Sequence, residues 1–351
     1  MISPVRVCLV GAGRAGRLHA NSLANHVPGA HLAAIVDSVP QILEETGLSY
    51  GLEPETRFET LEIALDKVQF EAVVITTPTF THHSLAVQAA EAGKHVFLEK
   101  PMGLSLGECE AIIASAHRRG VKLQLGFMRR FDPEFSAAAE RIKAGEIGRP
   151  MLVKSLTHGP GLPPRWAWDL NKSNGMLAEV NSHDWDTVRW LMDSDYERVY
   201  AETGNFKGAS HNITSPDFYD NALVSIRFEN GGLGSISGVC PCDYGYDARV
   251  EIVGDRGIMQ IGELQGQAVI ICTNRDQGLI TPVFRTWPER FAWGYINEMR
   301  HFIDCIQTDQ APLVGGEEGR WAVAGVLAAT KSFLEQRPVY LREILTPAGV
   351  G

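Results

Sequence analysis

Hydrophobic and polar positions alternate between two patterns along the first third of the chain. Short, continuous apolar runs rich in β-branched residues indicate buried strands, and the segments between them carry apolar side chains at helical spacing. The predicted strands are 5–10, 31–36, 72–75, 95–98 and 121–125, and the predicted helices end near 25 or span 81–93 and 106–119. This alternation predicts parallel strands joined by right-handed crossovers, so we expect a doubly wound α/β sheet.

After residue 126 the pattern changes to short strands separated by tight turns. The predicted strands are 222–228, 233–239, 248–253 and 269–271, and the predicted helices are 135–144, 176–192, 293–307 and 320–336. Consecutive short strands with glycine-rich turns favour an open, largely antiparallel sheet. We therefore expect an α/β chain of two domains, residues 1–125 and 126–351, with the final helices available to pack back on the first domain.

The predicted parallel sheet places several polar residues at one edge. Gly11, Asp37, Thr77 and Lys100 each follow a predicted strand. Because the carboxyl ends of parallel strands open on the same side of a doubly wound sheet, we expect these residues to surround one crevice.

Composition and charge narrow the class of protein. The chain has 351 residues, of which 44% are hydrophobic and 21% charged, and a net charge of −10 that disfavours nucleic acid and anionic membranes as partners. The six cysteines are scattered and form no zinc-site spacing, so we expect reduced thiols and no metal. Neither a signal peptide nor a bilayer-spanning run is recognisable, and we expect a cytoplasmic protein without a membrane partner.

The first turn carries a dinucleotide-binding pattern. Gly11, Gly13 and Gly16 follow a strand and open a helix, and Asp37 ends the next strand, where a carboxylate binds ribose hydroxyls. An ordinary glycine-rich turn is the alternative, but this context favours the cofactor. Since Asp37 would repel the extra phosphate of NADP, we expect NAD, with NADP still possible through Arg14 or Arg17.

Two ionisable residues follow later strands of the same sheet. Lys100, between Glu99 and Pro101, sits at the expected cofactor edge, where its ammonium could hydrogen-bond a substrate hydroxyl. A surface salt bridge is the alternative role for a lysine in general. Because Lys100 lies on the edge of the sheet where ligands bind, we favour contact with the substrate. His82 lies at the start of the predicted helix 81–93, and a histidine in this position is, on its own, more typical of helix capping than of catalysis.

The second domain offers a candidate base. Glu179 and His183 stand four residues apart in the predicted helix 176–192, so the carboxylate could orient the imidazole and raise its basicity. The alternative is a buried histidine that a neighbouring acid merely satisfies. Aromatic and polar residues that suit the ring faces and hydroxyls of a polyol or sugar stand in loops and rim segments, namely Arg130, His158, Trp166, Trp168, Tyr244, Tyr246 and Arg249.

Together these segments resemble the Gfo/Idh/MocA dehydrogenases, and within them the inositol 2-dehydrogenase branch. The resemblance covers nearly the whole chain. Its motifs are the glycine turn 11–16, Thr77-Pro78 with His82, the segment 92–101 ending in Glu99-Lys100-Pro101, 126–132, 148–150, the segment from Glu179 to Trp190-Leu191, 246–249 and 316–319.

The resemblance implies a Rossmann domain, a substrate-binding domain whose open sheet also serves assembly, and a homo-oligomer, either tetramer or dimer. It implies catalytic roles for Lys100, His183 and Glu179, although Glu179 stands where inositol dehydrogenases usually carry Asp. The expected cofactor-binding residues are Gly11, Gly13, Arg14, Ala15, Gly16, Asp37, Thr76, Thr77, Pro78, His82, Glu99 and Lys100. The expected substrate-binding residues are Lys100, Arg130, His158, Trp166, Trp168, His183, Tyr244 and Tyr246.

The function that follows is NAD-dependent oxidation of a secondary hydroxyl of a cyclic polyol or sugar. One alternative is a redox-neutral enzyme that retains NAD and cleaves glycosides through transient oxidation and elimination. A non-catalytic NAD-binding regulator is a third possibility, which the simultaneous presence of Lys100 and His183 disfavours. The isomer, the carbon that is oxidised and the physiological direction are left open.

Overall fold

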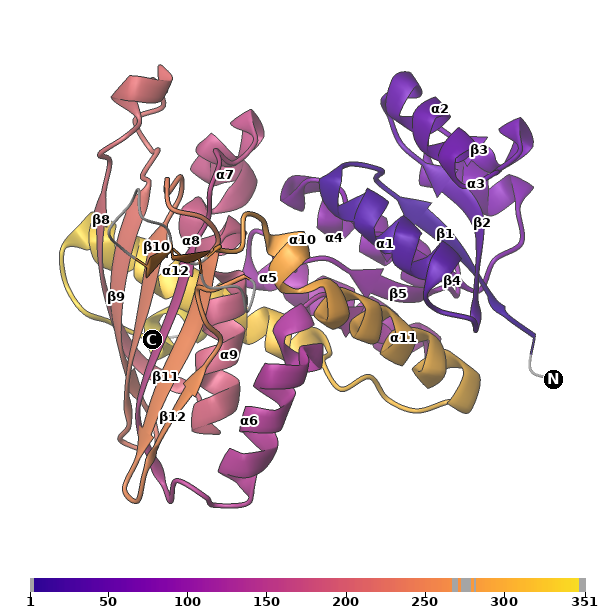
Figure 1. Ribbon diagram of the computed structural model, residues 1–351. Coiled ribbons are helices and arrows are strands. Elements are labelled where there is room, and N and C mark those ends of the chain that lie inside the picture. The colour runs from indigo at the N-terminus through magenta and orange to yellow at the C-terminus, as the bar shows by residue number, and fades with distance from the viewer. Residues whose placement is uncertain (1–2, 267–270, 273–278, 281, 347–351) are drawn as a thin grey trace. The chain divides into compact units, whose positions relative to one another are not determined.

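The computed structural model describes residues 3–266, 271–272, 279–280 and 282–346 (Figure 1). The chain divides into two compact units, each built from two stretches of sequence. The first unit comprises Met1–Phe131 and Trp293–Val323, and the second comprises Asp132–Ala292 and Ala324–Gly351. Each unit has its own sheet and its own covering helices.

The first unit contains a six-stranded parallel sheet. Its strand order is β3-β2-β1-β4-β5-β6, and the order reverses direction between β1 and β4, which is the switch point of a doubly wound sheet. The strands are β1 (Val5–Val10), β2 (Ala30–Val36), β3 (Arg57–Phe58), β4 (Ala72–Ile75), β5 (His95–Leu98) and β6 (Leu123–Leu125). The predicted doubly wound α/β fold is confirmed.

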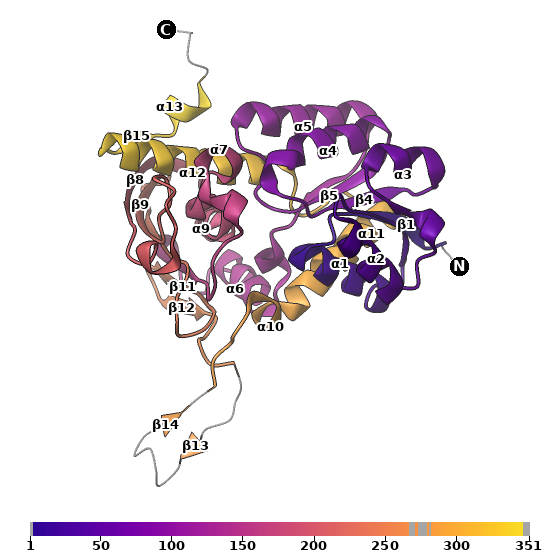
Figure 2. The same ribbon diagram turned by 90° about the horizontal axis from the view of Figure 1, so that it is seen from above.

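Helices cover both faces of this sheet. Figures 1 and 2 show α1 (Arg14–Asn25) and α11 (Ala292–Thr308) on one face, and α4 (His82–Glu91) and α5 (Leu106–Arg119) on the other. Leu9 of β1, Leu23 of α1 and Phe302 of α11 belong to one buried cluster, so the late helix α11 completes the core of the N-terminal sheet. The remaining helices are α2 (Pro40–Ser49), α3 (Leu61–Lys67) and the short 3-10 turns η1 (Pro54–Thr56), η2 (Thr79–Thr81) and η3 (Met128–Phe131).

The second unit contains a seven-stranded sheet of order β12-β11-β7-β10-β9-β8-β15. Only β7 and β10 pair in parallel among these strands, which confirms the prediction of a largely antiparallel sheet. The strands are β7 (Pro150–His158), β8 (Tyr196–Gly204), β9 (Asn221–Phe228), β10 (Leu233–Val239), β11 (Asp247–Gly254), β12 (Ile258–Ile261) and β15 (Val339–Tyr340). A separate pair joins β13 (Ile271–Cys272) and β14 (Leu279–Ile280), and residues 269–270 of the predicted strand 269–271 lie outside the described residues.

Helices α6 (Pro133–Lys143) and α9 (Ser182–Met192) lie on one face of this sheet (Figures 1 and 2). The other helical segments are η4 (Arg165–Trp168), α7 (Leu170–Ser173), α8 (Met176–Glu179), η5 (Ala209–His211), α10 (Trp287–Arg290), α12 (Gly316–Glu335) and α13 (Arg342–Leu345). Within the described residues, no helix is both long and apolar enough to cross a bilayer.

The predicted single helix 176–192 is wrong, because the chain forms two helices there. Helix α8 ends at Glu179, and α9 begins at Ser182 after a turn at Val180 and Asn181. The side-chain amide nitrogen of Asn181 donates to Asp184 Oδ2 at 2.7 Å and to the carbonyl oxygen of Ser237 at 3.3 Å, so this turn is tied both to α9 and to strand β10. Glu179 and His183 therefore do not share one face of a continuous helix.

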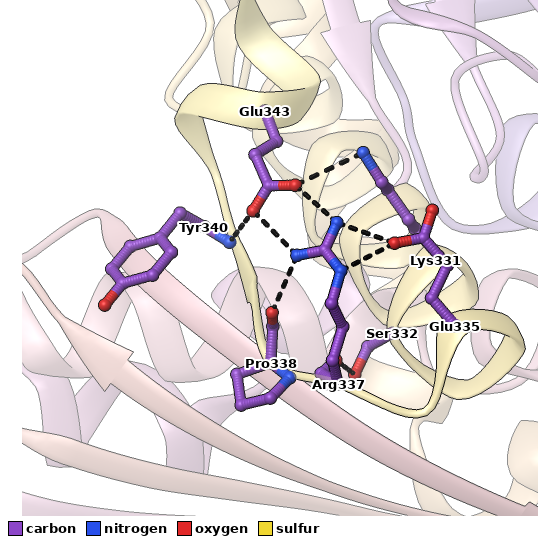
Figure 3. Close-up of polar contacts among 7 residues, drawn as sticks. All are labelled: Lys331, Ser332, Glu335, Arg337, Pro338, Tyr340 and Glu343. Carbon is purple, nitrogen blue, oxygen red and sulfur yellow. Dashed lines mark hydrogen bonds and ion pairs between the residues drawn. The ribbon is translucent and has the colours of Figure 1, made fainter.

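An ion-pair network joins the end of α12 to α13 and to β15 at the edge of the second sheet (Figure 3). The guanidinium of Arg337 bonds both Glu335 and Glu343 at 2.7 Å, and Lys331 adds a contact to Glu343 at 3.3 Å. Glu343 also accepts the backbone N–H of Tyr340 in β15. The hydrogen bond from Arg337 is the main cause that lowers the pKa of Glu343 to about 2.

Candidate active site

The turn between β1 and α1 requires glycine at two of its three positions for different reasons. Gly11 has a φ of 93°, and a Cβ there would lie 2.9 Å from Thr77 Cγ2. A Cβ on Gly16 would lie 1.9 Å from the carbonyl oxygen of Gly11, so glycine is what lets α1 pack against this turn. At Gly13 no described atom lies within 4 Å of the Cβ position. That open space is what a pyrophosphate needs to approach the backbone.

The N-terminus of α1 is open to an anion. Gly13 is the residue before the helix, and no described side chain caps the first turn. Arg14 is exposed and Ala15 is half-buried, and the first turn contains no acidic residue. The backbone N–H groups and the positive end of the helix dipole therefore favour a phosphate at this point.

Asp37 lies directly beside this turn. Its Oδ2 accepts the backbone N–H of Ala12 at 2.7 Å, and its Oδ1 accepts that of Val39 at 2.9 Å. These bonds hold the carboxylate at the carboxyl end of β2, and each oxygen keeps a lone pair for a ribose hydroxyl. The residues present thus fit a dinucleotide with an unmodified adenosine ribose.

The loop after β4 packs against the glycine turn. Thr76 Oγ1 donates to the carbonyl oxygen of Gly11 at 2.5 Å, and Thr81 Oγ1 donates to Thr77 Oγ1 at 2.7 Å. Pro78 follows as a half-buried residue of the same loop. The structure therefore brings the predicted residues at the ends of β1 and β4 together.

His82 joins the loops that follow β4 and β5. Its Nδ1 lies 2.7 Å from the carbonyl oxygen of Pro101, and its Nε2 lies 2.8 Å from that of Thr77. The residue is only 1% exposed. Burial lowers the pKa of His82, and the two carbonyl acceptors oppose this effect because they favour the doubly protonated ring. His82 positions the two loops, and its contact with the cofactor stays a prediction.

Lys100 follows β5 as a half-buried residue, and Glu99 beneath it is tightly held. Glu99 Oε2 accepts the backbone N–H of Lys100 at 3.0 Å, and Glu99 Oε1 lies 2.8 Å from His19 Nε2. Burial would raise the pKa of Glu99, but the hydrogen bond and charge of His19 and the charge of Lys100 outweigh it, so the net shift is downward. Glu99 is therefore a buried carboxylate that fixes the backbone at Lys100.

In the second unit, His183 stands in the first turn of α9 and is 5% exposed. The next residue, Asp184, anchors this turn to the sheet. Its carboxylate accepts hydrogen bonds from Ser155 Oγ at 2.5 Å and Thr157 Oγ1 at 2.7 Å, in addition to the bond from Asn181. Strand β7 thus determines where α9 begins and holds His183 in place.

His158 and Tyr244, two predicted substrate-binding residues, hydrogen-bond each other. Tyr244 in turn donates to Asp247 Oδ2 at 3.2 Å, and Arg249 pairs with the same carboxylate at 2.6 Å. Because Thr157 points toward α9 and successive strand residues alternate, His158 points to the opposite face of the sheet. The structure therefore joins these residues in one hydrogen-bonded group where β7 ends and β11 begins.

The other predicted substrate-binding residues belong to η4, to the segment before β11 and to η3. Trp166 and Trp168 lie half-buried in η4, where the indole N–H of Trp168 donates to the carbonyl oxygen of Pro163 at 3.0 Å. Tyr246 is 6% exposed and packs edge-on against Phe291. Arg130 is a buried residue of η3 in the first unit. Their contact with a substrate stays a prediction.

Comparison with known proteins assigns the family. Residues 5–127 match the oxidoreductase family with an NAD-binding Rossmann fold, and residues 135–260 match the GFO/IDH/MocA C-terminal domain. The chain is 35% identical to a scyllo-inositol 2-dehydrogenase (NAD(+)) of Bacillus subtilis over 345 residues, which cover 96% of each protein. The chain belongs to the Gfo/Idh/MocA oxidoreductase family. The family resemblance drawn from the motifs is confirmed.

Further relatives extend this similarity over the full length. A myo-inositol 2-dehydrogenase of Thermotoga maritima is 31% identical, with 97% of this chain and 100% of that protein covered. The crystal structure of a scyllo-inositol dehydrogenase from Lactobacillus casei with bound NAD(H) and scyllo-inositol superposes with a TM-score of 0.88 at 26% identity, covering 97% of this chain and 99% of that one. This chain is accordingly an NAD-dependent oxidoreductase that acts on CH–OH groups. The NAD cofactor that the glycine turn and Asp37 predicted is confirmed.

Proposed function

We propose that this chain oxidises a secondary hydroxyl of a cyclic polyol, with an inositol as substrate and NAD⁺ as acceptor. The observation that carries the proposal is the full-length similarity to two inositol 2-dehydrogenases, together with a first unit whose glycine turn, helix N-terminus and Asp37 fit the dinucleotide. When bound, NAD⁺ supplies the hydride acceptor. The chain supplies binding, orientation and the groups that handle the proton.

Lys100 is proposed to bind the reacting hydroxyl. Lys100 follows the carboxyl end of β5, on the ligand edge of the sheet, and its backbone is held by Glu99. A positive charge there stabilises the oxygen as its proton leaves.

His183 is proposed to remove that proton, with Glu179 assisting. Removal of a hydroxyl proton near neutral pH suits an imidazole. Strand β7 holds His183 rigidly through Asp184, which meets the need of a general base for a defined position. Since α8 ends at Glu179, we propose that this carboxylate acts from the preceding helix.

The remaining predicted contacts complete the proposal. Cofactor contacts are proposed for the glycine turn, Arg14, Ala15, Thr76, Thr77, Pro78, His82 and Glu99, and substrate contacts for Arg130, His158, Trp166, Trp168, Tyr244 and Tyr246. In functional terms, we propose that residues 1–125 bind the cofactor and that residues 126–351 bind the substrate and mediate assembly.

A substrate panel tests this function. Inositol isomers, aldoses and glycosides are offered with NAD⁺ and NADP⁺ separately, and NADH or NADPH is followed by its absorbance. We expect an inositol to give the highest kcat/KM and NAD⁺ to exceed NADP⁺ by about tenfold or more, because the Asp37 carboxylate repels a 2′-phosphate. Turnover of a glycoside without net NADH would instead indicate the redox-neutral enzyme. Absence of any turnover despite NADH binding would indicate a regulator.

We further propose a cytoplasmic homo-oligomer that associates through the open face of the second sheet. Along each strand, every second residue points to the face opposite α9. On that face Leu156 of β7, Ser237 of β10 and Leu223 of β9 are paired across neighbouring strands and form one row. Leu223 is 61% exposed. Apolar side chains left in the middle of a sheet face favour burial against a second copy.

A further inference from the structure

Three ionisable side chains from three elements meet in the interior of the first unit. They are His19 of α1, Glu99 after β5 and Glu298 of α11, and their nearest nitrogen and oxygen atoms lie within 4.8 Å of one another. His19 and Glu298 are fully buried, and Glu99 is 6% exposed. Two carboxyl groups in one buried site must share their charge and protons.

The hydrogen bonds in this cluster are unequal. Both oxygens of Glu99 have partners, since one bonds His19 and the other accepts the backbone N–H of Lys100. Among the described residues, neither carboxyl oxygen of Glu298 has a hydrogen-bond partner. A buried carboxylate without donors costs several kcal/mol, about 2 or more per lost bond, whereas a neutral acid carries its own donor.

Among the described residues, the charge that acts on Glu298 is that of Glu99, whereas His19 bonds and pairs with Glu99. The ionisable groups that face it are Glu99 and His19, with Lys100 next along the chain from Glu99. Aromatic rings of Phe97 and Tyr295 pack at 5.0 and 5.7 Å from the His19 ring.

The backbone around the two carboxyl groups is also fixed. Gln124 of β6 donates to the backbone oxygen of Glu298 at 2.8 Å. Gly126 leaves room for the Glu99 carboxyl group, because a Cβ there would lie 3.1 Å from Glu99 Cδ. The backbone of Glu298 is therefore tied to β6, and the Glu99 carboxyl group packs against the residue that follows β6.

Glu99 and Glu298 would repel each other if both carried a negative charge. Burial and the charge of Glu99 raise the pKa of Glu298 well above its ordinary value, while the pKa of Glu99 is lowered. Two carboxyl groups whose surroundings drive their pKa values apart divide into one acid and one carboxylate.

We propose that Glu298 is a neutral carboxylic acid that donates its proton in a hydrogen bond to the Glu99 carboxylate and so acts as a positioning residue for Lys100. The inference rests on the proposed function, because Lys100 is taken as the group that binds the substrate hydroxyl. Glu99 then has three donors, namely His19, Glu298 and the Lys100 backbone, and the turn that carries the ammonium has one orientation.

Two substitutions of similar size distinguish a donor from a merely structural side chain. In Glu298→Gln the amide N–H replaces the acid O–H, so the bond to Glu99 survives. In Glu298→Met the volume is kept but the donor is lost. We expect kcat of E298Q to stay within about threefold of wild type, and kcat of E298M to fall about tenfold with KM for NAD⁺ nearly unchanged.

A second readout does not depend on catalysis. Because the folded-state pKa of Glu298 is raised, the folded protein binds this proton more tightly, and stability is lost as pH rises from the ordinary carboxyl pKa toward the raised one. E298Q lacks this loss. The Tm of E298Q minus that of wild type should therefore grow as pH rises above the ordinary carboxyl pKa.

These readouts separate failure of the inference from failure of the proposed function. If wild type oxidises no polyol but the Tm difference grows with pH, the proton assignment stands and the function is wrong. A Tm difference that does not vary with pH, or a kcat loss in E298Q equal to that in E298M, overturns the inference. A Tm increase on adding Mn²⁺ that E298Q abolishes overturns it too, because the cluster would then ligate a cation. If E298M does not fold, E298Q against wild type decides.

Discussion

At the scale of single residues, Asp184 shows how a buried charge is made tolerable. The side chain is fully buried and accepts hydrogen bonds from Ser155, Thr157 and Asn181. The three donors replace the water molecules that this carboxyl group loses on burial. Because Asp184 follows His183 directly, the same three bonds also hold the proposed base.

Removal of this carboxylate should destabilise the fold. In Asp184→Ala the three donors lose their shared acceptor, and we expect the free energy of unfolding to fall by about 3 kcal/mol or more. Urea-induced unfolding of the full chain measures the loss. The matched control is Asp243→Ala, whose carboxylate pairs with Lys207 at the surface and should leave the unfolding midpoint unchanged. Equal effects of the two variants would contradict the account.

Local geometry explains which site residues could be predicted from the sequence. The glycines and Asp37 belong to one strand-turn-helix-strand segment, so their spacing alone indicates the fit seen around Gly11 and Gly16. His19, Glu298 and Asp184 were not predicted, because each owes its role to partners that the fold brings from distant elements. Ser155 and Thr157 stand two residues apart, which would place both side chains on one face of a strand. They are a weak signal for a buried acid such as Asp184, and this signal can be used only once the strand is known.

At the scale of elements, the ends of a helix were predicted correctly where the sequence carries residues that start and stop a helix. The predicted helix 106–119 is confirmed at both ends, because Ser105 caps its start through the N–H of Glu108 and Gly120 ends it with a φ of 64°. The helix 320–336 begins earlier than predicted, at Gly316, and the strand 121–125 begins at Leu123.

Periodicity alone could not reveal the break between α8 and α9. Apolar and polar residues on either side of Val180 continue at helical spacing, and the interruption comes from the side chain of Asn181 bonding Asp184 and the carbonyl oxygen of Ser237. Strands β7 and β8 were missed for a related reason. One of their faces is polar or exposed, so they lack the continuous apolar run that marked the strands of the first unit.

At the scale of the whole molecule, the open face of the second sheet makes assembly testable. We expect light scattering of the purified chain to give the mass of two or four copies. Leu223→Arg replaces the exposed leucine of β9 by a charged side chain and should yield single chains at the same concentration.

Leu48→Arg is the matched control for this change. Leu48 is 63% exposed on α2 of the first unit, so its variant should keep the wild-type mass. A wild-type chain that is a monomer would contradict the proposed assembly. Dissociation by L48R and not by L223R would show that the chains associate through another surface.

The most direct measurement of the central claim follows NADH formation by wild type and Lys100→Met mixed with NAD⁺ and an inositol. The account predicts rapid NADH formation by wild type and a rate at least about 10³-fold lower for K100M, because methionine keeps the bulk and removes the charge that binds the hydroxyl. NADH binding, measured by fluorescence, should be retained by both proteins. A K100M enzyme that forms NADH at a rate near that of wild type would contradict the account.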